Sequence, residues 1–199
     1  MKQFCHSSRK QTERPLSIVA FAVFDTLPYH SNQEMTKTLN IDFGPITLDN
    51  VEQLRKVNMA CFPISYNDTF YKDVVVRKNE GLNKFAYWNG FVVGAVCARR
   101  EPIADGRDRL YLMTLAVLAA YRGRQVGTKL IQSVLDYYQE MKDDELSTVD
   151  EIALHVQISN DDAIKFYTAR FGFFKGEMVE NYYRRIDPPH CYLLYKKLR

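Results

Sequence analysis

The apolar residues of this chain first recur with a helical period after residue 50. They occupy positions 51, 54, 57 and 61, which predicts an amphipathic helix along this segment. We expect Thr47 to cap its start and the Phe62-Pro63 pair to end it, because proline disfavours a helical conformation in the residue before it. Ser65 and Asp68 have the spacing of a capping box, which predicts a second, short helix over residues 66–75.

The next apolar segments have the character of β-strands. Residues 84–88 and 91–99 flank Asn89-Gly90, the strongest short signal for a β-hairpin, since a type I′ turn needs positive φ at both central residues. Residues 109–118 are nearly all apolar, as expected for a strand that is covered on both faces.

Strand and helix patterns then alternate to the end of the chain. An amphipathic helix with six apolar residues along one side (130, 131, 134, 135, 138 and 141) follows residues 109–118, and a second strand–helix pair covers residues 151–158 and 160–171. Residues 173–183 and 190–198 predict two further strands. This order predicts an α/β fold with a mixed central sheet and crossover helices.

Residues 1–40 differ from the rest of the chain. A basic, polar start precedes an apolar run of seven residues, 18–24, and a second polar stretch follows. The order resembles a secretory signal, but its only A-x-A pattern, Ala20 and Ala22, lies inside the apolar run. We therefore expect a poorly ordered extension, or an extra strand, before a single domain over residues 41–199.

Composition narrows the functional classes. The chain has 199 residues, 46% hydrophobic and 26% charged, which is the balance of a globular protein, and its longest apolar run is too short to cross a membrane. A net charge of +3 is too small to indicate nucleic acid binding. The four cysteines are far apart, so we expect unpaired thiols, a reducing compartment and no metal site.

Two segments carry candidate chemistry. Residues 115–130 read L-A-V-L-A-A-Y-R-G-R-Q-V-G-T-K-L, a basic, glycine-containing loop that enters a helix; backbone N–H groups there form a cradle for a diphosphate. Residues 159–173 read S-N-D-D-A-I-K-F-Y-T-A-R-F-G-F, a helix that Ser159 or Asn160 caps and Gly172 ends. Each alone is also typical of an ordinary helix entry or a well-capped core helix.

Together the two segments resemble the GCN5-related N-acetyltransferase (GNAT) superfamily. The match extends to F-P-I-S-Y-N-D-T-F-Y-K-D-V (62–74), R-L-Y-L-M-T-L (109–115), L-H-V-Q-I-S-N (154–160) and N-Y-Y-R-R-I (181–186). These four motifs are similar to those of the NatE type of protein N-terminal acetyltransferase. The resemblance covers residues 41–199 and implies the GNAT fold, with a mostly antiparallel mixed sheet flanked by helices.

The resemblance also implies roles for individual residues. It makes Tyr111 and His155 the catalytic residues, which act through ordered water on the substrate α-amino group. It implies a peptide groove formed by Phe62, Pro63, Ile64, Tyr66, Met113, Tyr182 and Tyr183. It implies acetyl-CoA contacts at Leu115, Val117, Arg122, Gly123, Arg124, Gln125, Val126, Gly127, Thr128, Asn160 and Tyr167.

The chemistry of these side chains is consistent with that reading. An α-ammonium has a pKa of about 8, so a weak base such as neutral histidine suffices to deprotonate it near neutral pH. The pKa of a phenol is near 10, which favours a water-positioning role for Tyr111. The thioester carbonyl needs a hydrogen-bond donor, and a backbone N–H near Leu115 is a candidate.

The chain departs from the family pattern in three places. Gln125 stands where the superfamily loop usually has glycine, and it is strained by about 1–3 kcal/mol if the backbone there has positive φ. The segment from Tyr167 to Gly172 is one residue longer than usual, which lengthens or bulges the end of the helix. Residues 142–150 are longer and more acidic than in the family, which predicts a surface loop.

The resemblance implies direct transfer of acetyl from acetyl-CoA to protein N-termini that begin with methionine and a hydrophobic or similar residue. Lysine acetylation is a secondary possibility. The implied partner is the NatA complex, through its helical-repeat auxiliary subunit, in the cytoplasm and also the nucleus, with no nucleic acid and no membrane. A non-catalytic acetyl-CoA-binding or scaffold subunit, which Gln125 favours, and an enzyme for small amines remain the alternatives.

Overall fold

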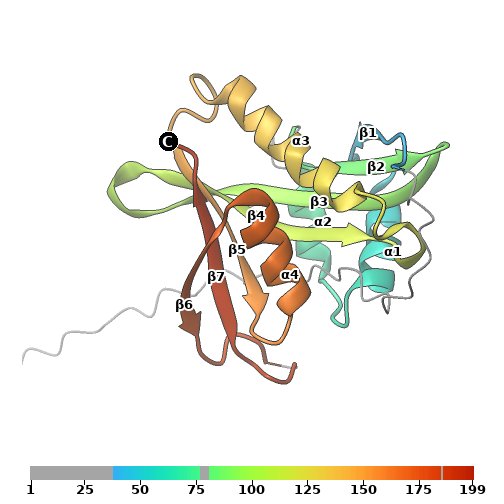
Figure 1. Cartoon of the computed structure of the whole chain (residues 1–199). Helices are drawn as coiled ribbons and strands as arrows, with labels where there is room; N and C mark the ends of the chain where they lie inside the picture. Colours follow the sequence, from blue (N-terminus) through green and yellow to red (C-terminus); the bar gives the residue numbers. More distant parts are fainter. Residues whose placement is uncertain (1–37, 77–80, 185) are drawn as a thin grey trace, which may run out of the picture.

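The computed structural model describes residues 38–76, 81–184 and 186–199, and its strands form one seven-stranded sheet in the order β1-β2-β3-β4-β5-β7-β6 (Figure 1). All neighbouring strands are antiparallel except β4 and β5. The mixed, mostly antiparallel sheet expected from the sequence is therefore confirmed. The strands are β1 (Asp42–Pro45), β2 (Lys84–Trp88), β3 (Phe91–Pro102), β4 (Asp108–Val117), β5 (Val149–Gln157), β6 (Phe174–Val179) and β7 (Cys191–Lys197).

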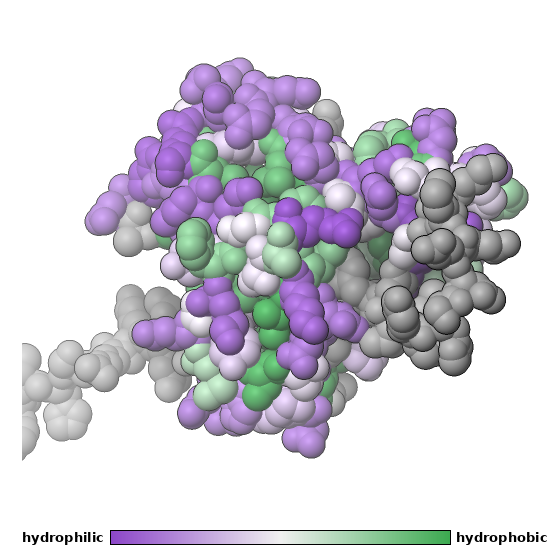
Figure 2. Space-filling view, in the orientation of Figure 1, coloured by the Kyte–Doolittle hydropathy of each residue, from purple (hydrophilic) through white to green (hydrophobic). Residues whose placement is uncertain are grey.

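Helices cover both faces of this sheet. Leu54 of α1 (Val51–Cys61) and the buried residues of α2 (Asp68–Val76) pack with Tyr111 and Met113 of β4. The buried residues of α3 (Val126–Met141) and α4 (Asp161–Lys165) pack with alternate residues of the same strand, including Leu110 and Leu112. Strand side chains alternate between the faces, so β4 is apolar throughout because both of its faces are covered. Hydrophilic residues cover most of the outer side of α3 (Figure 2).

The hairpin turn and the second helix show how local sequence sets these elements. Asn89 and Gly90 have φ values of 48° and 80° between β2 and β3, as the predicted turn requires. Asn67, rather than Ser65, caps α2, because its side-chain oxygen accepts a bond of 3.0 Å from the N–H of Phe70. The predicted capping box was wrong about this helix start, and α2 begins two residues later than expected.

The expected cap of the first helix was also wrong. The residue before α1 is Asn50, and its side-chain oxygen accepts a bond of 2.8 Å from the N–H of Thr47. Thr47 therefore begins a turn that precedes the helix. An asparagine side chain can close such a turn, so the helix begins after Asn50 and not directly after Thr47.

The second crossover helix contains the irregularity expected from its extra residue. Asn160 caps α4 by accepting from the N–H of Ala163 at 3.1 Å. A π-helical turn, η3 (Phe166–Arg170), follows α4 directly. One inserted residue is commonly absorbed in this way, and the helix ends at Gly172, whose φ is 69°.

The described part of the chain starts to pack before residue 41. Leu39 is 6% exposed and belongs to the larger core cluster with Ile41. The Lys129 ammonium donates to the carbonyl of Leu39 at 2.7 Å. The expectation of a poorly ordered segment over residues 1–40 otherwise falls on residues 1–37, outside the described residues. Among the described helices, none has the length and apolar character needed to span a bilayer.

Candidate active site

The central parallel pair of strands separates partway along its length. β4 pairs with β5 over only its first four residues, from Asp108 to Tyr111, while β5 continues to pair with β7 as far as Gln157. The remaining six residues of β4 thus have β3 as their only strand partner among the described residues. This separation opens a gap in the sheet and leaves backbone groups on one edge of β4 without a pairing strand in the described part of the chain.

Two of those backbone positions are the predicted coenzyme contacts Leu115 and Val117. The N–H of Leu118 donates to the carbonyl of Val93 on β3 at 3.0 Å. Because hydrogen-bonded and non-hydrogen-bonded pairs alternate in antiparallel strands, Leu115 and Val117 direct their N–H and C=O groups away from β3. The carbonyl of Val117 accepts from the Cys61 thiol at 3.4 Å and from Arg122 Nε at 3.1 Å on that side.

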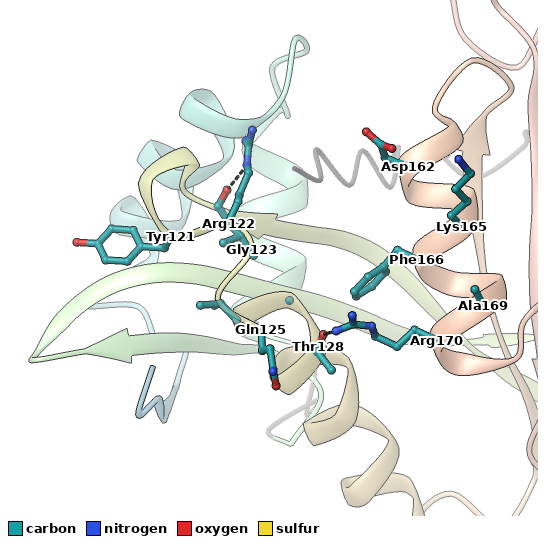
Figure 3. Close-up of a pocket in the computed structure, with 13 residues that line it drawn as sticks. Tyr121, Arg122, Gly123, Gln125, Thr128, Asp162, Lys165, Phe166, Ala169 and Arg170 are labelled. Carbon is teal, nitrogen blue, oxygen red and sulfur yellow. Dashed lines mark hydrogen bonds between the residues drawn. The ribbon is translucent and has the colours of Figure 1, made fainter. Parts of the chain in front are cut away.

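The predicted diphosphate loop lies at the end of β4 and encloses one side of a cavity of about 830 Å³ (Figure 3). Gly123 and Gln125 both have positive φ, at 68° and 64°, and α3 starts immediately afterwards. The first N–H groups of α3 have no partner within the helix, which suits an anion. The predicted residues that line this cavity are Val117, Arg122, Gly123, Gln125, Val126, Gly127 and Thr128; Arg124 and Leu115 do not line it.

The opposite wall of the cavity was not predicted. It consists of Asp162, Lys165, Phe166, Ala169 and Arg170, with Tyr121 at the loop end (Figure 3). These five positions recur at spacings of three, one, three and one, which is the pattern of one helix face. That spacing was visible in the sequence, but only the fold shows that this face is turned toward the basic loop.

The two residues predicted on this helix as coenzyme contacts occupy other positions. Asn160 caps α4, as described above, and lies outside the cavity lining. Tyr167 is fully buried, and its ring packs edge-on against those of Phe166 and Phe173 at 5.1 Å and 5.3 Å. In this structure Tyr167 belongs to the core between α4 and the sheet.

Tyr111 and His155 meet where the strands separate. The hydroxyl of Tyr111 lies 2.8 Å from Nδ1 of His155. The hydroxyl of Tyr182 lies 3.2 Å from both of these atoms, and its ring stacks on the imidazole at 4.3 Å. Three residues from two strands and the loop before β7 thus form one cluster of polar atoms. The sequence placed Tyr182 only in the peptide groove.

Burial sets the protonation of this cluster. Burial, and secondly the positive charge of Arg109, lowers the pKa of His155 to about 4. Burial, followed by the neighbouring Tyr182, raises the pKa of Tyr111 well above its usual value. The imidazole is therefore neutral, and the phenol keeps its proton, at physiological pH.

An aromatic and apolar cluster lies beside these groups. Phe62 and Tyr183 are buried in it, and Ile64, Tyr66 and Tyr182 pack against it. The rings of Phe62 and Tyr66 are in edge contact at 5.8 Å, and those of Tyr182 and Tyr183 at 5.0 Å. Met113 lies in the adjoining cluster with Tyr111, while Pro63 is exposed. The predicted groove residues are thus gathered in one region, although they come from three segments of the chain.

The described cysteines form neither disulfides nor a metal site. Cys61, Cys97 and Cys191 are free and buried, as expected of unpaired thiols. Within residues 38–76, 81–184 and 186–199, no three histidine, cysteine, aspartate or glutamate side chains gather where they could hold a metal ion.

Comparisons with known proteins agree with this geometry. The acetyltransferase (GNAT) family profile matches residues 51–173. N-alpha-acetyltransferase 50 of Danio rerio is 46% identical over 159 residues, which are 80% of this chain and 89% of that protein. A probable N-acetyltransferase, san, of Drosophila melanogaster is 43% identical over 83% of this chain and 84% of its own length.

A solved structure is similar in fold and sequence. Arabidopsis thaliana Naa50, in complex with the bisubstrate analogue CoA-Ac-MVNAL, superposes with a TM-score of 0.69 and 39% identity over 79% of this chain and 99% of that one. The mixed seven-stranded sheet flanked by helices therefore matches the GNAT fold.

Proposed function

The chain belongs to the acetyltransferase (GNAT) family and is a protein N-alpha-acetyltransferase, and from this membership we propose that it acetylates N-termini by direct transfer in a ternary complex. The observation that carries the proposal is the cluster of Tyr111, His155 and Tyr182 at the point where β4 and β5 separate. Tyr182 also packs on the apolar groove residues, and the cavity begins at Val117, at the other end of the same strand as Tyr111.

The gap between β4 and β5 and the cavity beside α3 together suit acetyl-CoA. Acetyl-CoA supplies an acetyl thioester for transfer when it is bound. The backbone groups of Leu115 and the N–H of Val117 are directed into the gap, where they can pair with an amide-containing arm, while the Val117 carbonyl is held by Cys61 and Arg122. The loop up to Thr128 and the start of α3 suit a diphosphate, because successive N–H groups and the helix dipole favour negative charge.

His155 acts as the general base through water in this proposal. Its lowered pKa leaves it neutral at physiological pH, so its lone pair is available to the bridging water, although the imidazole is then only a weak base. A weak base suffices because the α-ammonium, with a pKa of about 8, is itself partly deprotonated near neutral pH. Tyr111, whose pKa is raised, keeps its proton, and its hydroxyl is hydrogen-bonded to Nδ1 of His155. Its role is to orient the imidazole and the water, and Tyr182 holds the same two atoms from the third side.

The apolar groove sets the substrate preference. Phe62, Ile64 and Tyr66 offer an apolar and aromatic surface beside the catalytic cluster, which suits a methionine side chain followed by a hydrophobic residue. The Arabidopsis neighbour was solved with an analogue that begins with methionine and valine, which supports this preference. Acetylation of lysine side chains is the secondary activity that we propose.

We propose that the enzyme joins the NatA complex through its helical-repeat auxiliary subunit and works in the cytoplasm and also the nucleus. These proposals rest on the resemblance of the sequence motifs to NatE-type enzymes.

Peptide acetylation by the purified chain tests the function. A peptide that starts Met-Leu is compared with the same peptide starting Ser-Leu and with a third whose N-terminus is blocked but which contains lysine. We expect rapid turnover of the first, slow turnover of the third and least of the second. Binding of acetyl-CoA without turnover of any peptide would instead identify a scaffold subunit.

A further inference from the structure

A single arginine joins the two walls of the coenzyme cavity. Arg170, in the π-helical turn, donates a hydrogen bond of 2.7 Å from Nη1 to the hydroxyl of Thr128 in α3. The two residues are 42 positions apart, and both line the cavity (Figure 3). The guanidinium thus lies across the first turn of α3, the place that suits a diphosphate.

This position is unfavourable for a cation unless an anion joins it. Thr128 is the third residue of α3, and the start of a helix carries partial positive charge, which repels cations. The partner of Arg170 at this end is a neutral hydroxyl, whereas guanidinium groups bind carboxylates and phosphates much more strongly. An anion that binds between Arg170 and the start of α3 would therefore gain favourable interactions with both.

The charges around the cavity support the same conclusion. The charged side chains that line it are Arg122, Lys165 and Arg170, against one carboxylate, Asp162. Arg122 is engaged through Nε by the carbonyl of Val117. The excess of positive charge is divided between the loop and the helix wall, so an anion between them is attracted from both sides.

The position of Arg170 depends on the extra residue of this chain. The segment between Tyr167 and Gly172 is one residue longer than the family pattern, and the π-helical turn that absorbs it ends at Arg170. At the opposite wall, Gln125 replaces a glycine at a φ of 64° and adds a side chain to the cavity. Arg170 on the helix wall therefore compensates for a loop in which Gln125 makes diphosphate binding less favourable.

We infer that Arg170 is a phosphate contact of the coenzyme that exchanges its bond to Thr128 for a phosphate oxygen when acetyl-CoA enters. The inference rests on the proposed use of acetyl-CoA. The coenzyme offers two sources of this chemistry, its diphosphate and its 3′-phosphate, and a guanidinium recognises both in the same way.

Calorimetric titration of the full chain with acetyl-CoA tests the inference in four variants. Arg170→Ala removes the charge, Arg170→Lys keeps it, and Arg170→Gln keeps a donor for Thr128 without charge. Lys56→Ala, on exposed surface of α1 at the other face of the sheet, is the control for loss of one positive charge. Thermal melts confirm that each variant is folded.

We expect Arg170→Ala and Arg170→Gln to weaken binding by about fivefold at low salt, as is typical of an exposed ion pair. Arg170→Lys should restore most of the affinity, and Lys56→Ala should change nothing. Since the contact is exposed, the difference should shrink as the ionic strength rises from about 0.02 M to about 0.5 M. A loss that disappears with 3′-dephospho-CoA assigns the contact to the 3′-phosphate, and a loss that persists assigns it to the diphosphate.

Unchanged affinity for acetyl-CoA in Arg170→Ala would overturn the inference. Normal affinity in Arg170→Gln would also overturn it, because a neutral donor to Thr128 would then suffice and the bond would be structural. If the unsubstituted chain itself fails to bind acetyl-CoA, the proposed function fails instead, so the two failures are distinguishable.

Discussion

The hydroxyl of Tyr111 lies 2.8 Å from Nδ1 of His155, although the two residues stand on strands that stop pairing at Tyr111. The last residue of β5 that pairs with β4 is Ala153, opposite Tyr111, and His155 is two residues further along the same strand. Residues two apart on a strand share a face. The contact therefore spans the first open position of the gap, where a thioester and an amine can meet.

We predict that His155→Ala and Tyr111→Phe lower kcat by about 100-fold, the lower range for loss of a positioned acid or base. The proposed coenzyme contacts lie elsewhere, so the Kd for acetyl-CoA should stay within about twofold. Steady-state peptide acetylation and calorimetric titration measure the two quantities. Tyr195→Phe, which removes a hydroxyl two strands away in the same register, is the control, and a normal kcat in both active-site variants would remove these residues from the mechanism.

The pH dependence of stability follows from the lowered pKa of His155. The pKa is about 4 in the folded chain and about 6.5 in the unfolded one. Between these values the unfolded state binds more protons, so this histidine contributes stability above pH 6.5 that is lost as the pH falls toward 4. The full difference is roughly 3 kcal/mol.

Replacing the imidazole with a group that does not titrate should remove this contribution. We predict that His155→Asn is destabilised less than the unsubstituted chain when the pH is lowered from 7 to 5. Urea denaturation at both values, with His190→Asn as the control for a histidine outside the catalytic cluster, gives the comparison. Parallel pH profiles for all three proteins would contradict the buried, neutral state of His155.

The loop prediction concerns Gln125. Its φ of 64° confirms the condition under which glutamine is strained, and its side chain lines the cavity. We predict that Gln125→Gly binds acetyl-CoA about fivefold more tightly, a gain of about 1 kcal/mol, because the diphosphate can approach the start of α3 more closely. Gln125→Ala shortens the side chain but keeps the Cβ at positive φ, so it should gain less. Weaker binding by the glycine variant would show that the glutamine amide takes part in coenzyme binding.

Local signals predicted most of the fold. Asn89-Gly90 requires positive φ, and the two strands beside it follow from that turn. The extra residue before Gly172 predicted a longer or bulged helix end, and the structure has the bulge. Both features depend on a few neighbouring residues, which is why the sequence reveals them. The starts of α1 and α2 were mispredicted because nearby asparagines compete for the same backbone groups.

The site was less predictable, because its residues are far apart in the sequence and come into contact only in the folded chain. Tyr182 is 71 residues from Tyr111 and 27 from His155, yet its hydroxyl lies 3.2 Å from an atom of each. No period in the sequence connects these three positions. The same holds for Arg170. Its spacing predicts which face of α4 and η3 it occupies, but not that this face lies opposite Thr128, which depends on the sheet topology.

The last prediction concerns the start of the domain. Met35 is the nearest methionine before Leu39, the first core residue in the described part of the chain. We predict that a chain begun at Met35 keeps nearly full stability and acetylates the same peptides, because residues 1–34 contain no motif for catalysis or coenzyme binding. A chain begun at Asp42 should lose stability, since it lacks the buried side chains of Leu39 and Ile41 and the carbonyl that Lys129 binds. Loss of one large buried side chain costs about 2–5 kcal/mol, so the second truncation should melt well below the first. Thermal melts and acetylation rates of the three chains separate the possibilities. A large fall in melting temperature for the chain begun at Met35 would place part of residues 1–34 in the core and move the start of the domain toward the N-terminus.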